Sequence, residues 1–287
     1  MSRNATKDLT TGSPMKLILG FGIPLLFGML FQQFYNMMDT IIVGKFLGVS
    51  ALASVGATGS INFMIIGFCM GVCNGFAIPV AQRFGAKDEH GMRKFVANSV
   101  WLSIIFAVVM AVLVCVFCRQ ILELMNTPED IIDGSYSYIF VIFLGIPATY
   151  MYNLLSGIMR SLGDSKTPLY LLIFSSILNI ILDLLSIIVL KMGVAGAAWA
   201  TVIAQAISGF CCLGVIWKKF PILHVQREEW QPDKLCILNL CNMGIPMGLQ
   251  YSITAIGSVI IQAAVNSLGS AAVASVAAAV KINMFLC

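Results

Sequence analysis

Two carboxylates stand inside long apolar stretches of this 287-residue sequence, where ionisable side chains are otherwise rare. Asp39 lies late in the first stretch, and Asp183 lies in the fifth with apolar residues on both sides. Ionisable residues inside a membrane span are costly, and by default they mark the path of an ion or a substrate. Two carboxylates buried together disfavour a state in which both are ionised, so such a pair suits the binding of a proton or a small cation.

Neutral polar side chains occur at positions compatible with the same site. Asn179 precedes Asp183 by four residues, so the two share one helix face. Thr201 offers a hydroxyl group in the sixth stretch, and Asn36 lies one turn before Asp39. Simpler explanations remain open: Asp39 as an interfacial residue near a helix end, and Asn179 and Thr201 as ordinary hydrogen-bonding residues between helices.

The elements that must position these residues are membrane helices. The sequence is 59% hydrophobic and only 10% charged, whereas a soluble domain carries about 25% charged residues. No dense basic stripe indicates nucleic-acid binding. A bilayer core needs about 20 apolar residues per helix, and the first apolar run is too long for a cleavable signal peptide. The stretches of this kind are 15–43, 51–80, 95–117, 131–158, 168–190, 194–217 and 235–266, with an eighth beginning near 270.

Positive charges give the expected orientation. Of the 17 Lys and Arg residues, 13 lie in the N-terminal segment, which holds Arg3 and Lys7, and in the even-numbered connections. Cytoplasmic connections carry an excess of Lys and Arg, so the N-terminus is expected on the cytoplasmic side of the cell (inner) membrane. At 1.5 Å per residue, Asp183 then lies roughly 25 Å and Asp39 roughly 35 Å from the cytoplasmic side, with Thr201 roughly 15 Å from the outer side. All three fall in the outer half of the bilayer and could meet there.

An internal repeat indicates two lobes. The motif GIP at 22–24 recurs at 244–246, ALASVGA at 51–57 is similar to AVASVAA at 272–278, and IN at 61–62 recurs at 282–283. Six helices fill one repeat, so both copies enter the membrane with the same orientation, as in parallel-repeat transporters. We therefore expect an all-α polytopic protein of twelve helices, of which about seven and a half are present. The expected parts are an N-lobe at 1–217, a cytoplasmic linker at 218–234 and the start of a C-lobe at 235–287.

Several longer motifs carry a resemblance to a known protein family. They are GIP at 22–24 leading to NMMDT at 36–40 and VGKFLG at 43–48, AQRFGAKD at 81–88, and SGIMRSLGDSKTP at 156–168. In these stretches, and over essentially its whole length, the sequence resembles multidrug and toxic compound extrusion (MATE) transporters of the prokaryotic type. Members have twelve helices, whereas this sequence stops in the eighth. A half transporter is expected to alternate access only when it pairs with another chain.

The resemblance implies a secondary antiporter that exports amphipathic organic cations in exchange for Na⁺ or H⁺ by alternating access. It implies no cofactor beyond the coupling ion, a small-molecule cationic substrate, a lipid bilayer around the protein, and a monomer when full length. The family's N-lobe cation site maps onto Asp39, Asn179, Asp183 and Thr201, the residues selected above by depth and polarity. Asn153 in the fourth helix also matches a polar position near that site.

A mechanism follows from these expectations. Na⁺ or a proton neutralises the carboxylate pair, helix 1 bends at Pro24, and the N-lobe cavity collapses and expels the substrate. Substrate and coupling ion compete for the same carboxylates. Because proline removes a backbone hydrogen bond, Pro24 could equally make a static kink, which is common in membrane helices.

Other functions remain as alternatives. A lipid-linked oligosaccharide flippase of related architecture needs cations to hold pyrophosphate, whereas the deep ionisable residues here are acidic. A passive channel, a sensor or a structural protein does not need an internal repeat with kinked helices. An enzyme is the weakest alternative, because the sequence shows no nucleophile–base pair and no metal-ligand set in the membrane. The exported compound and the choice between Na⁺ and H⁺ stay open.

Overall fold

The computed structural model describes residues 12–286, and the side chains through residue 280. Arg3, Lys7 and Cys287 lie outside the described residues. Every regular element in the described part is a helix. In chain order these are α1 (Pro14–Leu47), α2 (Val49–Gly85), α3 (Glu89–Val116), α4 (Cys118–Leu124), α5 (Ile132–Leu144), α6 (Ile146–Ser161), α7 (Lys166–Leu184), the π turn η1 (Leu185–Val189), α8 (Gly193–Lys219), the 3₁₀ turns η2 (Pro221–Leu223) and η3 (Arg227–Trp230), α9 (Lys234–Asn266) and α10 (Ser270–Leu286).

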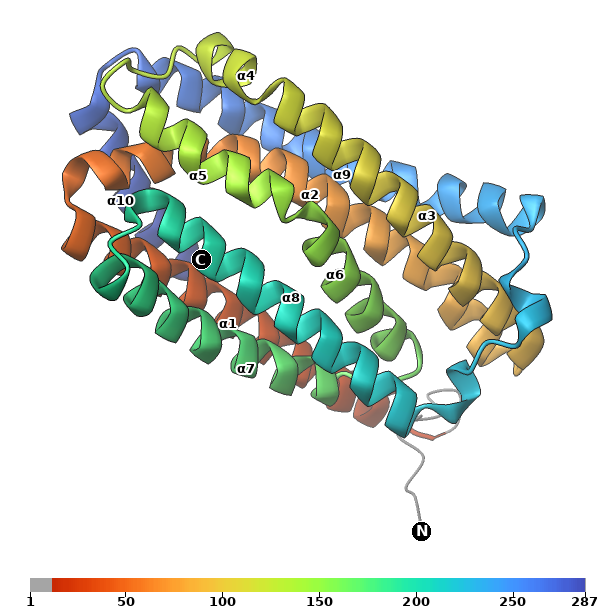
Figure 1. Cartoon of the computed structure of the whole chain (residues 1–287). Helices are drawn as coiled ribbons and strands as arrows, with labels where there is room; N and C mark the ends of the chain where they lie inside the picture. The colour runs from red at the N-terminus through yellow and green to blue at the C-terminus, as the bar shows by residue number, and fades with distance from the viewer. Residues whose placement is uncertain (1–11, 287) are drawn as a thin grey trace.

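These helices confirm the membrane architecture. Six of them, α1, α2, α3, α7 with η1, α8 and α9, are long and apolar enough to cross a bilayer, and a bent pair makes a seventh candidate. The long axes run side by side along the molecule (Figure 1). Large apolar side chains cover much of the outer surface, with Val112 58% and Phe210 66% exposed. Such a surface suits lipid rather than water, so the chain is a multi-pass membrane protein.

The bent pair is α5 and α6, which meet at an angle of 46°. Sequence reasoning predicted one uninterrupted stretch over 131–158. Proline is tolerated in the first turn of a helix and disrupts the interior of one. Pro147 follows the break at Gly145 and stands in the first turn of α6, so the stretch divides there into two helices.

The most extensive helix contact joins α2 and α9 (Figure 1). Small residues allow a close approach: a methyl group at Gly71 would come within 2.5 Å of the Met247 carbonyl oxygen, and one at Gly75 within 2.5 Å of the Gly244 Cα. Glycines at four-residue spacing commonly let membrane helices pack this closely. The helix α9 therefore lies directly against α2.

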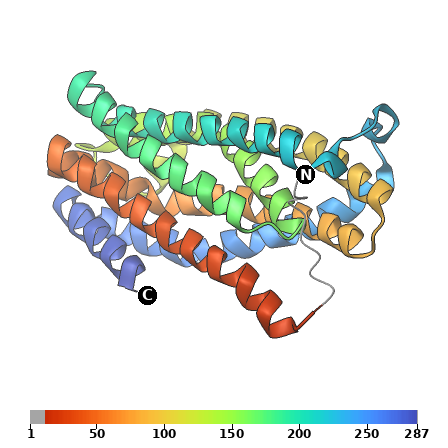
Figure 2. The same cartoon turned by 90° about the horizontal axis from the view of Figure 1, so that it is seen from below.

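A second group of helices, α1, α7 and α8, packs on the other side of the molecule (Figure 2). Few side chains of α1 are buried, but its contact with α7 is close, since a methyl group at Gly28 would touch Leu169 and Leu172. Short polar groups inside these helices are therefore brought towards one another, and the candidate site lies here.

Candidate cation site

Asp183 occupies the last turn of α7 and is completely buried, and Asn179, one turn earlier, is 1% exposed. Their four-residue spacing places both side chains on one face, as the sequence predicted. The helix then continues as the π turn η1 over Leu185–Val189. Such turns are rare and are frequent at functional sites. No pattern in the sequence indicates this π turn.

Asp39 of α1 lies within hydrogen-bonding reach of the Asp183 carboxyl group. The packing of α1 against α7 brings the two together from residues that are 144 positions apart in the sequence. A carboxylate shielded from water strongly disfavours a second negative charge beside it. One proton or one small cation between the carboxyl groups would relieve this repulsion.

Thr201 of α8 connects to this pair through Asn179. With the Asn179 amide turned so that it satisfies both neighbours, its nitrogen donates to Asp183 Oδ2 at 2.9 Å. Its oxygen then accepts from Thr201 Oγ1 at 3.3 Å and from the Thr201 backbone N–H at 3.2 Å. Tyr35 completes the row by donating from its hydroxyl to Thr201 Oγ1 at 3.2 Å. Four of the residues chosen from the sequence thus lie in one cluster.

Two tyrosines belong to the surroundings of the pair and were missed by sequence reasoning. Tyr35 lies four residues before Asp39, so a search for polar residues on the same helix face would have found it. Tyr138 of α5 is 6% exposed and close enough to Asp39 and Asp183 for their charges to act on it. Nothing in the sequence indicates that α5 packs near these helices, so Tyr138 could not be predicted as a neighbour of the carboxylate pair.

The two remaining polar candidates, Asn36 and Asn153, make other contacts. The Asn36 amide donates along α1 to Gln33 Oε1 at 3.3 Å. The Asn153 amide donates at 2.8 Å to the Thr149 carbonyl oxygen in its own helix, and the Thr149 hydroxyl donates to Gln205 Oε1 at 2.5 Å. The hydrogen bond of Asn153 thus stays within α6, and Thr149 makes the polar contact between α6 and α8.

Pro24 is buried in the first half of α1, which continues as one helix through it. The proline ring leaves the carbonyl group four residues earlier, that of Gly20, without its usual backbone donor. This weak point lies on the helix that carries Asp39. The arrangement is compatible with a static kink and with a bend that changes.

The two carboxyl groups and the Thr201 hydroxyl group supply oxygen atoms that suit a hard cation, while the Asn179 amide oxygen faces Thr201 in the orientation described above. Within residues 12–286, no three His, Cys, Asp or Glu side chains come together as a transition-metal site would require. The donor set fits Na⁺ and fits a proton equally well.

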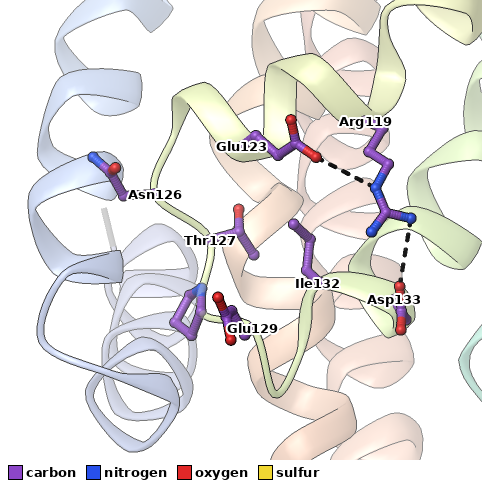
Figure 3. Close-up of a pocket in the computed structure, with 8 residues that line it drawn as sticks. Arg119, Glu123, Asn126, Thr127, Glu129, Ile132 and Asp133 are labelled. Atoms are coloured by element: carbon purple, nitrogen blue, oxygen red, sulfur yellow. Dashed lines mark hydrogen bonds and ion pairs between the residues drawn. The ribbon is translucent and has the colours of Figure 1, made fainter.

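A polar pocket lies elsewhere, between α4 and the start of α5 (Figure 3). Arg119 Nε approaches Glu123 Oε1 at 3.3 Å, and Arg119 Nη1 approaches Asp133 Oδ1 at 3.8 Å. These side chains are well exposed, and exposed ion pairs of this kind contribute little stability. None of the residues of the carboxylate cluster lines this pocket.

Known proteins are similar to this chain in sequence and in fold. The MatE family profile matches residues 24–185. The chain is 32% identical over 89% of its length to the probable multidrug resistance protein YoeA of Bacillus subtilis, covering 57% of that protein. It is 29% identical over 97% of its length to the probable multidrug resistance protein YpnP of the same organism, covering 62% of it.

Among solved structures, an inward-facing multidrug resistance MATE family transporter of the MOP superfamily superposes with a TM-score of 0.82. The identity is 25%, over 93% of this chain and 61% of that one. The chain thus spans about three fifths of the length of the relatives it matches. With the family profile covering more than half of its residues, this chain belongs to the MatE family of multidrug and toxic compound extrusion transporters.

Proposed function

We propose that the protein acts in the export of amphipathic organic cations, driven by exchange for Na⁺ or H⁺. Family membership supports transport rather than catalysis, and two relatives carry the name of multidrug resistance proteins. The observation that carries the proposal is the contact between the carboxyl groups of Asp39 and Asp183 inside the helix bundle. An organic cation and a coupling ion can both neutralise such a pair.

The proposed exchange depends on competition at this pair. With the pair anionic, a cationic substrate is held by its charge. When Na⁺ or a proton neutralises the pair, that attraction is lost and the substrate leaves. The row of hydrogen bonds from Tyr35 through Thr201 and Asn179 to Asp183 fixes the orientation of one carboxyl group, and Pro24 gives α1 the freedom to bend as the charge changes.

The proposed setting is the cell membrane, with the N-terminus in the cytoplasm, as the distribution of Lys and Arg indicates. We place the first lobe at 1–217, the cytoplasmic linker at 218–234 and the beginning of the second lobe at 235–287. The internal repeat at an offset of about 222 residues supports this division. A complete exporter would consist of two such lobes, with the cleft between them alternating between the two sides of the membrane.

The proposal is tested with the full-length gene product in proteoliposomes, by efflux of a fluorescent organic cation first under an imposed Na⁺ gradient and then under a pH gradient. Wild type should export under one of them, and Asp183→Asn should transport no faster than protein-free liposomes. Asp130→Asn is the matched control, because Asp130 is an exposed carboxylate outside the helices, and it should export like wild type. Equal export by Asp183→Asn and wild type would refute the proposed role of the pair.

A further inference from the structure

The connection between α8 and α9 contains a carboxylate that is buried although the segment is polar. Glu229 is 1% exposed, whereas its neighbour Glu228 is exposed. Burying a charge is costly unless it is paired and hydrogen-bonded. A linker that only tethers two parts of a protein has no need to bury a carboxylate, so the contacts of Glu229 indicate what this segment does.

All the partners of Glu229 that come from outside the linker lie at the start of α3. Arg93 Nε donates to Glu229 Oε1 at 2.9 Å and to Oε2 at 3.0 Å. His90 Nδ1 lies 2.8 Å from Oε1, and the Gln226 backbone N–H donates to Oε2 at 2.8 Å. Both carboxylate oxygens are thus satisfied. Removing one partner of a buried pair leaves an uncompensated charge and is strongly destabilising.

Two more contacts hold the following residues to the same helix. Trp101 of α3 donates from its ring nitrogen to the Trp230 carbonyl oxygen at 3.1 Å, and the two rings meet edge to face at 6.4 Å. The Asp233 backbone N–H donates to the Oδ1 of the buried Asn98 at 3.0 Å. The attachment therefore runs along α3 from residue 90 to residue 101.

Asp233 is also the N-cap residue of the next helix, α9. Its side chain caps α9 by accepting from the backbone N–H groups of Leu235 and Cys236. One residue therefore joins α3 to the N-terminus of α9. Further along, Gly244 and Gly248 of α9 pack against the backbone and Phe side chains of α2. The first half of α9 is held by α3 at its start and by α2 in its middle.

We propose that Glu229 is a positioning residue that fixes the linker and the start of α9 to α3, so that they move with the first six membrane helices as one rigid body. The linker then holds the start of α9 against α3. A movement of later helices relative to the first lobe takes place beyond residue 248 of α9. This proposal rests on the contacts alone and does not depend on the direction or chemistry of transport.

The test measures the distance between spin labels at Ile105 on α3 and Leu235 at the start of α9, both of which are exposed. Labels on non-cysteine amino acids are needed, because the chain contains nine cysteines. The purified chain in lipid nanodiscs should give one narrow distance distribution that stays the same in saturating Na⁺ and at a mildly acidic pH at which Glu229 is still ionised. Glu229→Gln should broaden the distribution at least twofold, and the control Glu228→Gln should not.

A broad distribution in the wild type, or a Glu229→Gln variant as narrow as wild type, would overturn the proposal. If Glu229→Gln does not fold, Arg93→Lys takes its place, since lysine keeps the charge but cannot hold both carboxylate oxygens with one planar group. Arg93→Lys should also broaden the distribution, and a width equal to that of wild type would contradict the assignment. A local role limited to the linker would leave the distance to Leu235 unchanged in every variant.

Discussion

At the scale of single residues, the proposed activity depends on charge in a place that water hardly reaches. Asp183 has no exposed surface, and Asp39 is half-buried beside it. Interactions between charges are several times stronger there than at the surface. One proton or one cation would therefore change the energy of the pair substantially.

The hydroxyl group of Thr201 should set how tightly the coupling ion is held. Thr201→Val keeps the shape of the side chain but removes the group that links Asn179 to Tyr35. Losing one such hydrogen bond costs about 1 kcal/mol, so we expect the Na⁺ or H⁺ concentration for half-maximal efflux to rise by about fivefold. Thr201→Ser retains the hydroxyl group and should behave as wild type. If the valine and serine variants showed the same dependence of efflux on ion concentration, the Thr201 hydroxyl group would have no role in binding the coupling ion.

Glu229 should give a defined pH dependence of stability. Burial alone raises the pKa of Glu229, but hydrogen bonds from the Gln226 amide, from Arg93 and from His90 outweigh it and hold the pKa below its usual value. A carboxylate whose pKa is lowered by folding stabilises the folded state above its unfolded-state pKa, and this contribution disappears as the pH falls through the folded-state pKa. Glu89, which pairs with Arg93 at 3.6 Å, and Asp88, which interacts electrostatically with His90, also face this cluster.

Wild type should therefore melt at a higher temperature than Glu229→Gln in detergent at pH 7, and the difference should shrink as the pH is lowered below about 4. Thermal unfolding across this range, followed by circular dichroism, makes the comparison. Glu228→Gln should have the same unfolding temperature as wild type at every pH. A difference that persists unchanged at the lowest pH would show that the charge of Glu229 contributes nothing.

At the scale of helices, the contact between α2 and α9 should tolerate no added volume. A methyl group at Gly71 would meet the backbone of Met247 and Gly248 at 2.5 and 2.7 Å, so one helix must shift. Overpacking of this kind costs about 1–3 kcal/mol. Gly71→Ala should lower the unfolding temperature in detergent. Gly59→Ala, on an exposed face of the same helix with nothing within 4 Å, should leave it unchanged or slightly higher.

The long helices could be predicted from the sequence because membrane spans are defined by their own composition. The predicted stretch 194–217 is observed as Gly193–Lys219, and 235–266 as Lys234–Asn266. The short helix α4 and the π turn after Asp183 depend on packing between helices, so the apolar pattern held no information on them. The burial of Glu229 was likewise invisible, since it requires Arg93, which is 136 residues away.

The candidate site was predictable to the extent that it follows from depth and helix periodicity. Asn179 and Asp183 share a face by spacing alone, and estimated depth brought Asp39 and Thr201 to the same level. The sequence could not say which helices are neighbours, and so it missed Tyr138 on α5. Asn153 was included on resemblance, and its amide hydrogen-bonds within α6.

At the scale of the whole molecule, the uneven distribution of positive charge should fix the orientation in the membrane. A tag at the N-terminus should react with a membrane-impermeant reagent only in inverted vesicles, in which the cytoplasmic side of the membrane faces outward. A tag inserted at the exposed Leu124, in the short helix α4 on the opposite side, should react in intact cells. Reactivity of the N-terminal tag in intact cells would reverse the proposed topology.

The central claim, that Asp39 and Asp183 form a site where an organic cation and a coupling ion compete, is tested most directly by equilibrium binding. The binding of a fluorescent organic cation to the purified chain would be measured while Na⁺ or H⁺ is titrated. We predict saturable binding that one of these ions displaces and that Asp183→Asn abolishes, while Asp130→Asn binds as wild type does. Binding that is unaffected by Asp183→Asn, or no binding to the folded wild type, would contradict this account.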